Sequence, residues 1–109
     1  MPAVFHHRDL EEDISFVVAK YTTIRDDLED VANLIRDGAR IGSRLSQFYP
    51  AWVFRVPISI SALGPDGEER CLLIFEIDGN DCTFLMLYDN DGNQDDEEVI
   101  NKITVRRET

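Results

Sequence analysis

The first half of the chain carries apolar residues at helical spacing. Segments 9–21 and 23–38 repeat an apolar residue every three or four positions, which is typical of helices that bury one side. Asp9 and Thr23 are the expected N-caps, and Gly38 is the expected end of the second helix. Because about two residues join these helices, we expect an antiparallel hairpin. Its buried positions are predicted to be Leu10, Ile14, Val17, Val18 and Tyr21, then Ile24, Leu28, Val31, Leu34 and Ile35.

The second half carries the patterns of β-strands. Residues 52–61 alternate between apolar and polar side chains, and Pro57 within them indicates a sheet edge or a bulge, because proline cannot donate a ladder hydrogen bond. After a turn at 64–67, the apolar run 69–78 predicts a central strand that is covered on both faces. A further strand is expected over 82–88.

The turn between the last two strands predicts their register. Gly79-Asn80 is typical of a two-residue hairpin loop, which sets Phe75 opposite Phe84 and Arg70 opposite Asp89. In this register Cys71 and Cys82 lie far apart along the ladder, beyond the reach of a disulfide. We therefore expect two buried, free thiols.

The order of these elements predicts an α+β fold. Asp95 and Glu98 are expected to cap a short last helix that carries Val99, Ile100 and Ile103, and residues 3–5 are a candidate for an additional short strand. We expect the helical hairpin to pack on one face of an antiparallel sheet of three or four strands. The predicted core consists of Ile14, Val17, Leu28, Val31, Ile35, Phe54, Leu73, Phe75 and Phe84.

Length and charge narrow the class of protein. A chain of 109 residues fits a single domain, 1–109. Its net charge of −11 repels nucleic acid and anionic membranes. The acidic residues are mostly Asp and the basic ones mostly Arg, which suits either a high-salt proteome or a protein that docks on a basic partner. Because no secretion signal or membrane-length apolar run is evident, we expect a cytoplasmic protein without a membrane partner.

No segment matches a metal or cofactor site. His6 and His7 are adjacent, so in an extended chain they point in different directions. The acidic run 89–98 begins like an EF-hand loop, but Gln94 stands where that loop needs glycine and Ile100 where it needs a bidentate glutamate. Signatures of hydrolase, zinc and nucleotide sites are missing as well. We therefore expect no metal and no cofactor.

Four segments carry a family resemblance. One family has a helical hairpin followed by a segment of small residues, and residues 19–42, AKYTTIRDDLEDVANLIRDGARIG, are similar to it. Residues 53–58, VFRVPI, are similar to the first long strand of that family. ERCLLIFEIDGNDCTFLMLYDNDG (69–92) is similar to a central hairpin with a strand-ending tyrosine, and DDEEVINKI (95–103) to the short helix after it. Together they resemble the RelE/ParE superfamily of toxin–antitoxin toxins.

The resemblance implies a function and three site residues. It implies a toxin, either a metal-independent endoribonuclease that cuts mRNA on the ribosome or an inhibitor of another core enzyme, silenced by an antitoxin peptide. Arg55, Arg70 and Tyr88 stand at positions that match the family's catalytic cations and terminal tyrosine. The arginines would stabilise charge that develops on the phosphate.

Departures from the family pattern and the charge favour a different function. Asn90-Asp91 stands where the family often has Lys-Ser, and Leu72 stands where many relatives have arginine. In this alternative, the arginines are ordinary strand cations, and the chain is a non-enzymatic acidic inhibitor or nucleic-acid mimic, for example phage-encoded, that binds a basic protein. The carboxylates that would bind this partner are Asp26, Asp27, Asp30, Asp89, Asp91, Asp95 and Asp96.

Overall fold

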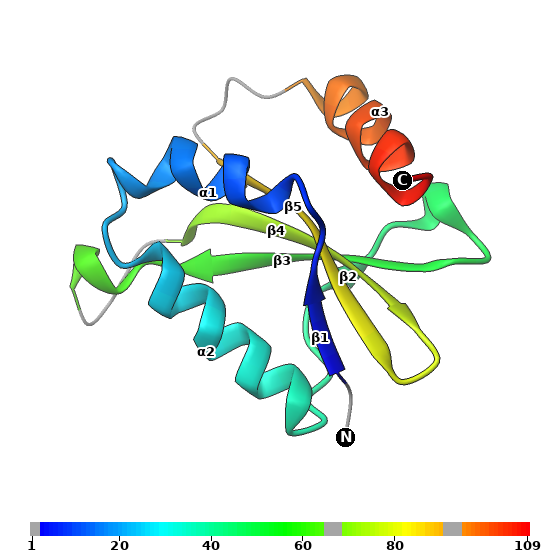
Figure 1. Ribbon diagram of the computed structural model, residues 1–109, viewed down its shortest axis with the longest axis horizontal. Coiled ribbons are helices and arrows are strands. Elements are labelled where there is room, and N and C mark those ends of the chain that lie inside the picture. The colour runs from blue at the N-terminus through cyan, green and yellow to red at the C-terminus, as the bar shows by residue number, and fades with distance from the viewer. Residues whose placement is uncertain (1–2, 65–68, 91–94) are drawn as a thin grey trace.

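The computed structural model describes residues 3–64, 69–90 and 95–109, which form an α+β fold (Figure 1). The candidate Asp91 therefore lies outside the described residues, and so does the predicted turn at 64–67 except for Gly64. The helices are α1 (Leu10–Val18), α2 (Ile24–Arg36) and α3 (Asp96–Arg107), with short 3-10 turns η1 (Ser46–Phe48) and η2 (Ser61–Leu63). The strands are β1 (Ala3–His6), β2 (Ser43–Arg44), β3 (Trp52–Ser59), β4 (Glu69–Asp78) and β5 (Asp81–Asp89).

The sheet is larger than predicted and mixed rather than antiparallel. Its five described strands lie in the order β1-β5-β4-β3-β2, and β1 runs parallel to β5. The candidate strand at 3–5 is confirmed as β1. The predicted number of three or four strands and their purely antiparallel arrangement are wrong, because the two-residue β2 is too short to show a periodicity and periodicity does not give the direction of β1. Pro57 lies beyond the end of β2 and pairs only with Leu72 of β4, so the predicted edge position is confirmed.

A bulge changes the register of the central hairpin. Near the turn the predicted pairing holds, with Phe75 opposite Phe84. The register then shifts by one residue, because Leu85 is inserted between Phe84 and Met86, which faces Ile74. Consequently Tyr88 lies opposite Leu72 rather than Cys71, and Asp89 lies opposite Cys71 rather than Arg70. A bulge has no alternating pattern in the sequence, so residue spacing does not predict it.

The helical segment agrees with prediction in part. The first helix ends at Val18 instead of continuing to Tyr21, and residues 19–23 connect it to α2. Gly38 ends α2 with φ +91°, where its N–H donates to Ile35 O, as predicted for a helix C-terminus. The predicted burial of Leu34 is wrong, because Leu34 is 49% exposed. The α2 residues that are buried against the sheet lie on a narrower stripe, namely Ile24, Leu28, Ala32 and Ile35.

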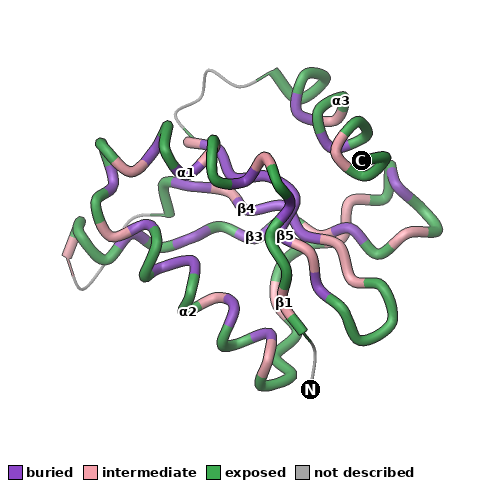
Figure 2. The backbone as a smooth tube through the Cα atoms, in the orientation of Figure 1, coloured by how far each residue is buried: buried purple, intermediate pink, exposed green. Residues whose placement is uncertain are grey.

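Both faces of the sheet are covered. One core joins α1 and α2 to the sheet and contains every residue of the predicted core, with Val31 and Phe54 partly buried. A second core joins α3 to the opposite face through Val99 and Ile103, which pack with Ile74, Met86 and Tyr88. In Figure 2 the buried segments follow the central strands, whereas the outer turns of the helices are exposed. The prediction that the central strand is covered on both faces is therefore confirmed, and α3 is the element that covers the second face.

Candidate functional site

Two of the three predicted catalytic residues meet under α3. Arg55 projects from β3 and Tyr88 from β5 into a pocket of about 220 Å³, which Asp96 from the first turn of α3 also lines. Burial raises the pKa of Tyr88, and the hydrogen bond and charge of Arg55 only partly oppose that shift. The Tyr88 hydroxyl is therefore protonated at neutral pH. It can donate a hydrogen bond, but it is a poor general base or nucleophile.

The third predicted catalytic residue, Arg70, lies in a different pocket. Ser59 pairs with Glu69 and Ile58 with Cys71, so Arg70 is the extra residue of a bulge between β3 and β4. It lines a pocket with Lys20, Tyr21 and Leu63 rather than the pocket of Arg55 and Tyr88. The three residues therefore do not form one constellation.

Asp89 binds residues of the first helical segment. Its carboxylate accepts hydrogen bonds from Lys20 Nζ at 2.9 Å and from Tyr21 Oη at 3.0 Å. The predicted pairing of Asp89 with Arg70 across the strands is wrong, because the bulge at Leu85 shifts the register. Burial, followed by the bond to Asp89, raises the pKa of Tyr21.

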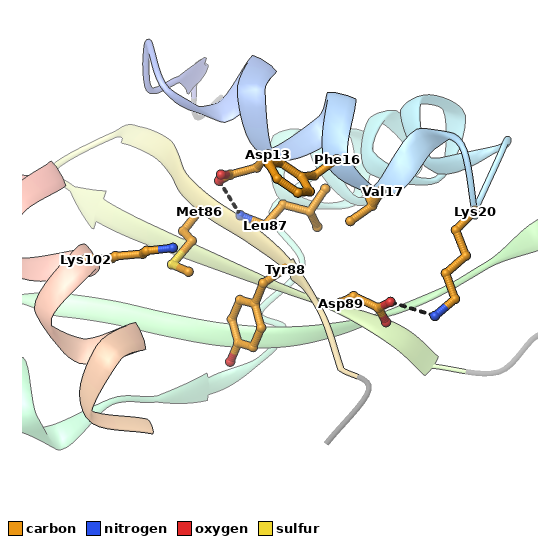
Figure 3. A pocket seen from close by; sticks show the side chains of 9 residues that line it. All are labelled: Asp13, Phe16, Val17, Lys20, Met86, Leu87, Tyr88, Asp89 and Lys102. Atoms are coloured by element: carbon orange, nitrogen blue, oxygen red, sulfur yellow. Dashed lines mark hydrogen bonds and ion pairs between the residues drawn. The ribbon is translucent and has the colours of Figure 1, made fainter. Parts of the chain in front are cut away.

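A groove of about 320 Å³ lies between α1, the end of β5 and α3 (Figure 3). Phe16, which is 83% exposed, lines it from α1, and Met86 and Tyr88 line it from β5. Both lysines of the chain, Lys20 and Lys102, also line this groove. Sequence reasoning missed this grouping. The scarcity of lysine in an arginine-rich chain was the available signal, but only the fold brings the two residues together.

The backbone at this groove is held by an ion pair. Strand β1 pairs with β5 only as far as Phe84, so the next residues of β5 have no strand beside them on that side. Asp13 Oδ2 accepts a hydrogen bond from Leu87 N at 3.0 Å, and Arg106 Nη1 donates to Leu85 O at 2.7 Å. Asp13 and Arg106 also bind each other and are largely buried. This ion pair joins α1, α3 and the edge of β5.

The predicted partner-binding carboxylates occupy different environments. Asp27 is only 3% exposed, and it accepts hydrogen bonds from Ser61 N, Ser61 Oγ and Thr23 Oγ1, so it belongs to the interior. Asp95 Oδ1 accepts a hydrogen bond from Glu97 N, which confirms its role as the cap of α3. Asp26 and Asp30 are exposed on α2, as expected of residues available to a partner.

The histidines and cysteines have structural environments. His7 is largely buried and contacts Thr109 Oγ1 through Nε2 at 2.8 Å. His6 is exposed and stacks on Phe84. Cys71 and Cys82 are buried free thiols, as predicted, and burial raises the pKa of each to about 12. Within the described residues, no cluster of His, Cys, Asp and Glu is suited to hold a metal ion.

Among the described helices, none has the length and apolar character needed to cross a bilayer. Comparison with family models, with curated proteins and with solved structures gives no match to this chain.

Proposed function

We propose that this chain is a non-enzymatic acidic binding protein that docks a basic protein partner on the exposed side of α2. The observation that carries the proposal is an asymmetry of charge. Most described cations are engaged by groups of the chain itself, whereas the exposed carboxylates of Asp26, Asp30 and Asp37 have no ion-pair partner within the described residues. A surface of this kind attracts cationic proteins and repels phosphate.

The engaged cations are spread over the whole fold. Arg55 lies against Tyr88, and Arg44 lies over the ring of Trp52. A nuclease without metal needs cations directed at the transferring phosphate, and these guanidiniums are directed at the protein. Other lysines and arginines form ion pairs with carboxylates, namely Lys20–Asp89, Arg25–Glu11, Arg36–Glu29, Arg106–Asp13 and Arg107–Glu76.

The free carboxylates of α2 share one side of the helix. Asp26 and Asp30 lie on α2 and Asp37 is its C-cap residue; all three are exposed, and their spacing at i, i+4 and i+11 brings them within a narrow sector of the helix surface. Asn33 lies in the same sector and Leu34 beside it, both exposed. A basic groove or helix on a partner would contact a row of carboxylates and, beside it, the apolar side chain of Leu34. We call Asp26, Asp30 and Asp37 the carboxylate row.

The test is the affinity of the chain for an oligoarginine peptide, measured by calorimetry at several salt concentrations. Reversing the row to Lys should weaken binding by about tenfold or more relative to a matched control, and the affinity of the wild type should fall steeply with salt. The control reverses Glu12, Asp81 and Glu108, which are exposed elsewhere and give the same change of net charge. Equal losses in the two triple variants would contradict a site on α2.

A toxin that cuts mRNA on the ribosome is the second candidate. The observation that favours it is the contact between Arg55 and Tyr88, two of the three residues that the family resemblance implies. In this case, the partners would be the ribosome with its mRNA and an antitoxin peptide. Expression in bacteria would arrest growth, and Arg55→Ala would relieve the arrest, because removing one such donor costs about 100-fold or more in rate.

Growth measurements separate the two candidates. The acidic binding protein predicts growth with the wild-type chain and no effect of Arg55→Ala or Arg70→Ala. Arg8→Ala, which removes an exposed cation elsewhere, is the control. Growth arrest that Arg55→Ala relieves and Arg8→Ala does not would overturn the proposed function and support the toxin.

A further inference from the structure

We propose a second interaction surface, independent of the carboxylate row, that binds a peptide segment of a partner through one aromatic side chain and the carboxylate next to it. This surface, the aromatic patch, consists of Arg40, Arg44, Tyr49, Trp52 and Phe54. Tyr49 is 75% exposed and Trp52 is 54% exposed. Trp, Tyr and Arg are the residue types enriched among the side chains that dominate protein–protein binding energies.

The patch is held rigidly by the protein. The guanidinium of Arg44 lies 3.8 Å from the ring centre of Trp52 and 5.3 Å from that of Tyr49. Arg44 Nη2 also donates to Pro50 O at 3.2 Å and to Ala51 O at 3.3 Å. A surface whose side chains are already ordered loses little conformational entropy when a ligand binds.

Trp52 is also anchored to the core. Its ring stacks with Phe54 at 6.3 Å between centres, and Phe54 stacks with Phe75 at 5.4 Å. Phe75 is buried and contacts Phe84 in the interior. A row of four aromatic rings therefore runs from the exposed Trp52 to the interior. A ligand at the surface would contact the Trp52 ring, which the other three rings hold in place.

A hollow beside Trp52 defines the chemistry of the ligand. Its volume is about 320 Å³, and Trp52, Phe54, Ile77 and Arg40 line it. Three of these walls are apolar, so an apolar side chain would fill the hollow. Arg40 is exposed and forms no ion pair with any residue that the structure describes, so it can bind a carboxylate next to that side chain.

The overall charge favours a peptide over a nucleic acid. A base that stacks on Trp52 with its phosphate on Arg40 would have similar local chemistry. However, a nucleic acid carries one charge per nucleotide, and its repulsion by a protein of net charge −11 accumulates along the strand. A peptide that carries a single carboxylate beside its aromatic residue experiences much less of this repulsion and matches the one cation of the hollow, so it is the occupant that fits.

Trp52 is the only tryptophan of the chain, so its fluorescence reports directly on the patch. The probe is the pentapeptide acetyl-Ala-Ala-Phe-Asp-Ala-amide, which has one carboxylate next to its phenylalanine, titrated into the full chain at moderate salt. We expect a saturable change in emission with a shift to shorter wavelength, because the bound phenylalanine removes water from Trp52. Arg40→Glu should weaken binding about tenfold or more. Trp52→Ala should abolish peptide binding, which is measured by calorimetry because this variant has no tryptophan fluorescence.

Three controls make the test specific. Arg8→Glu makes the same change of charge at an exposed position elsewhere. It should leave the affinity within about twofold of the wild type, because an exposed charge outside the binding site contributes little to the affinity. A peptide with alanine in place of phenylalanine should not bind measurably. No saturable binding by the probe, equal losses for Arg8→Glu and Arg40→Glu, equal binding of the alanine peptide, or tighter binding of a short deoxythymidine strand would each overturn the proposal.

Discussion

At the scale of single residues, the local environment decides which side chains are available for chemistry. Asp26 and Asp27 are neighbours with the same side chain, yet Asp26 is exposed and Asp27 accepts hydrogen bonds in the interior. Tyr88 also depends on its environment. Its position at the end of β5 suits a catalytic role, but burial raises its pKa. A residue type at a family position therefore indicates a function only if its environment allows the chemistry.

Phe75→Ala is expected to lower the free energy of unfolding by about 3–5 kcal/mol, because it removes a buried ring that contacts both Phe54 and Phe84. Phe16→Ala is the matched control. Phe16 is 83% exposed, so its loss should change stability by less than about 0.5 kcal/mol. Urea titration measures both values. A loss below about 1 kcal/mol for Phe75→Ala would contradict its place in the core.

The two thiols should make the protein less stable in alkaline solution. Burial raises the pKa of Cys71 and Cys82 from 9.0 to about 12, so between these pH values the unfolded chain releases protons that the folded chain keeps. Stability therefore falls as pH rises above about 9, by roughly 1–2 kcal/mol for both thiols together between pH 8 and pH 9.5.

Urea titrations at pH 8 and pH 9.5 measure this loss. The variant with Cys71→Ala and Cys82→Ala should lose less stability over the same interval. The same protonation keeps both thiols unreactive in the folded protein, so a thiol reagent should modify them at pH 8 only after denaturation. Rapid modification of the native chain would show that the thiols are accessible.

At the scale of elements, bulges and short strands set the arrangement of the candidate site. Leu85 shifts the end of β5 by one residue and sends Asp89 to Lys20, while the bulge at Arg70 moves this residue away from Arg55. The bulge at Leu85 therefore places Tyr88 opposite Leu72, on the face of the sheet that carries Arg55. The bulge at Arg70 separates Arg70 from both residues.

Asp27 joins α2 to η2, and its loss should be costly. Asp27→Ala leaves the Ser61 N–H and the Thr23 hydroxyl without their acceptor. We expect a loss of about 1–3 kcal/mol in the free energy of unfolding, since buried donors lose their partner. Asp26→Ala, one residue away and exposed, should change stability by less than about 0.5 kcal/mol. Similar values for the two variants in thermal or urea unfolding would contradict the structural role of Asp27.

At the scale of the whole molecule, the sheet divides the protein into two cores and charge dominates its surface. The helices α1 and α2 cover one face and α3 covers the other (Figure 1). The buried pair of Asp13 and Arg106 connects the helices of the two faces. With a net charge of −11, the exposed carboxylates repel one another, and the compact folded state brings them closer than the unfolded chain does.

Salt should therefore stabilise the folded protein. The screening length falls from about 30 Å at 0.01 M to about 8 Å at 0.15 M, so the repulsion between distant carboxylates is largely removed. We expect the midpoint of thermal unfolding to rise over this range. The variant with Asp26, Asp30 and Asp37 reversed to Lys carries a smaller net charge and should respond less. A midpoint that falls with added salt would mean that attractive ion pairs outweigh the repulsion.

The features that depend on local periodicity could be predicted from the amino-acid sequence. They are the α+β class, the two N-terminal helices, the Gly79-Asn80 turn, the cap at Asp95 and the core around Phe75 and Phe84, which follow from side chains a few residues apart. The parallel position of β1, the bulges, the burial of Asp27 and the grouping of Lys20 with Lys102 emerge only in the folded chain. These features arise from contacts between segments far apart in the chain, and such contacts leave no periodic signal in the sequence.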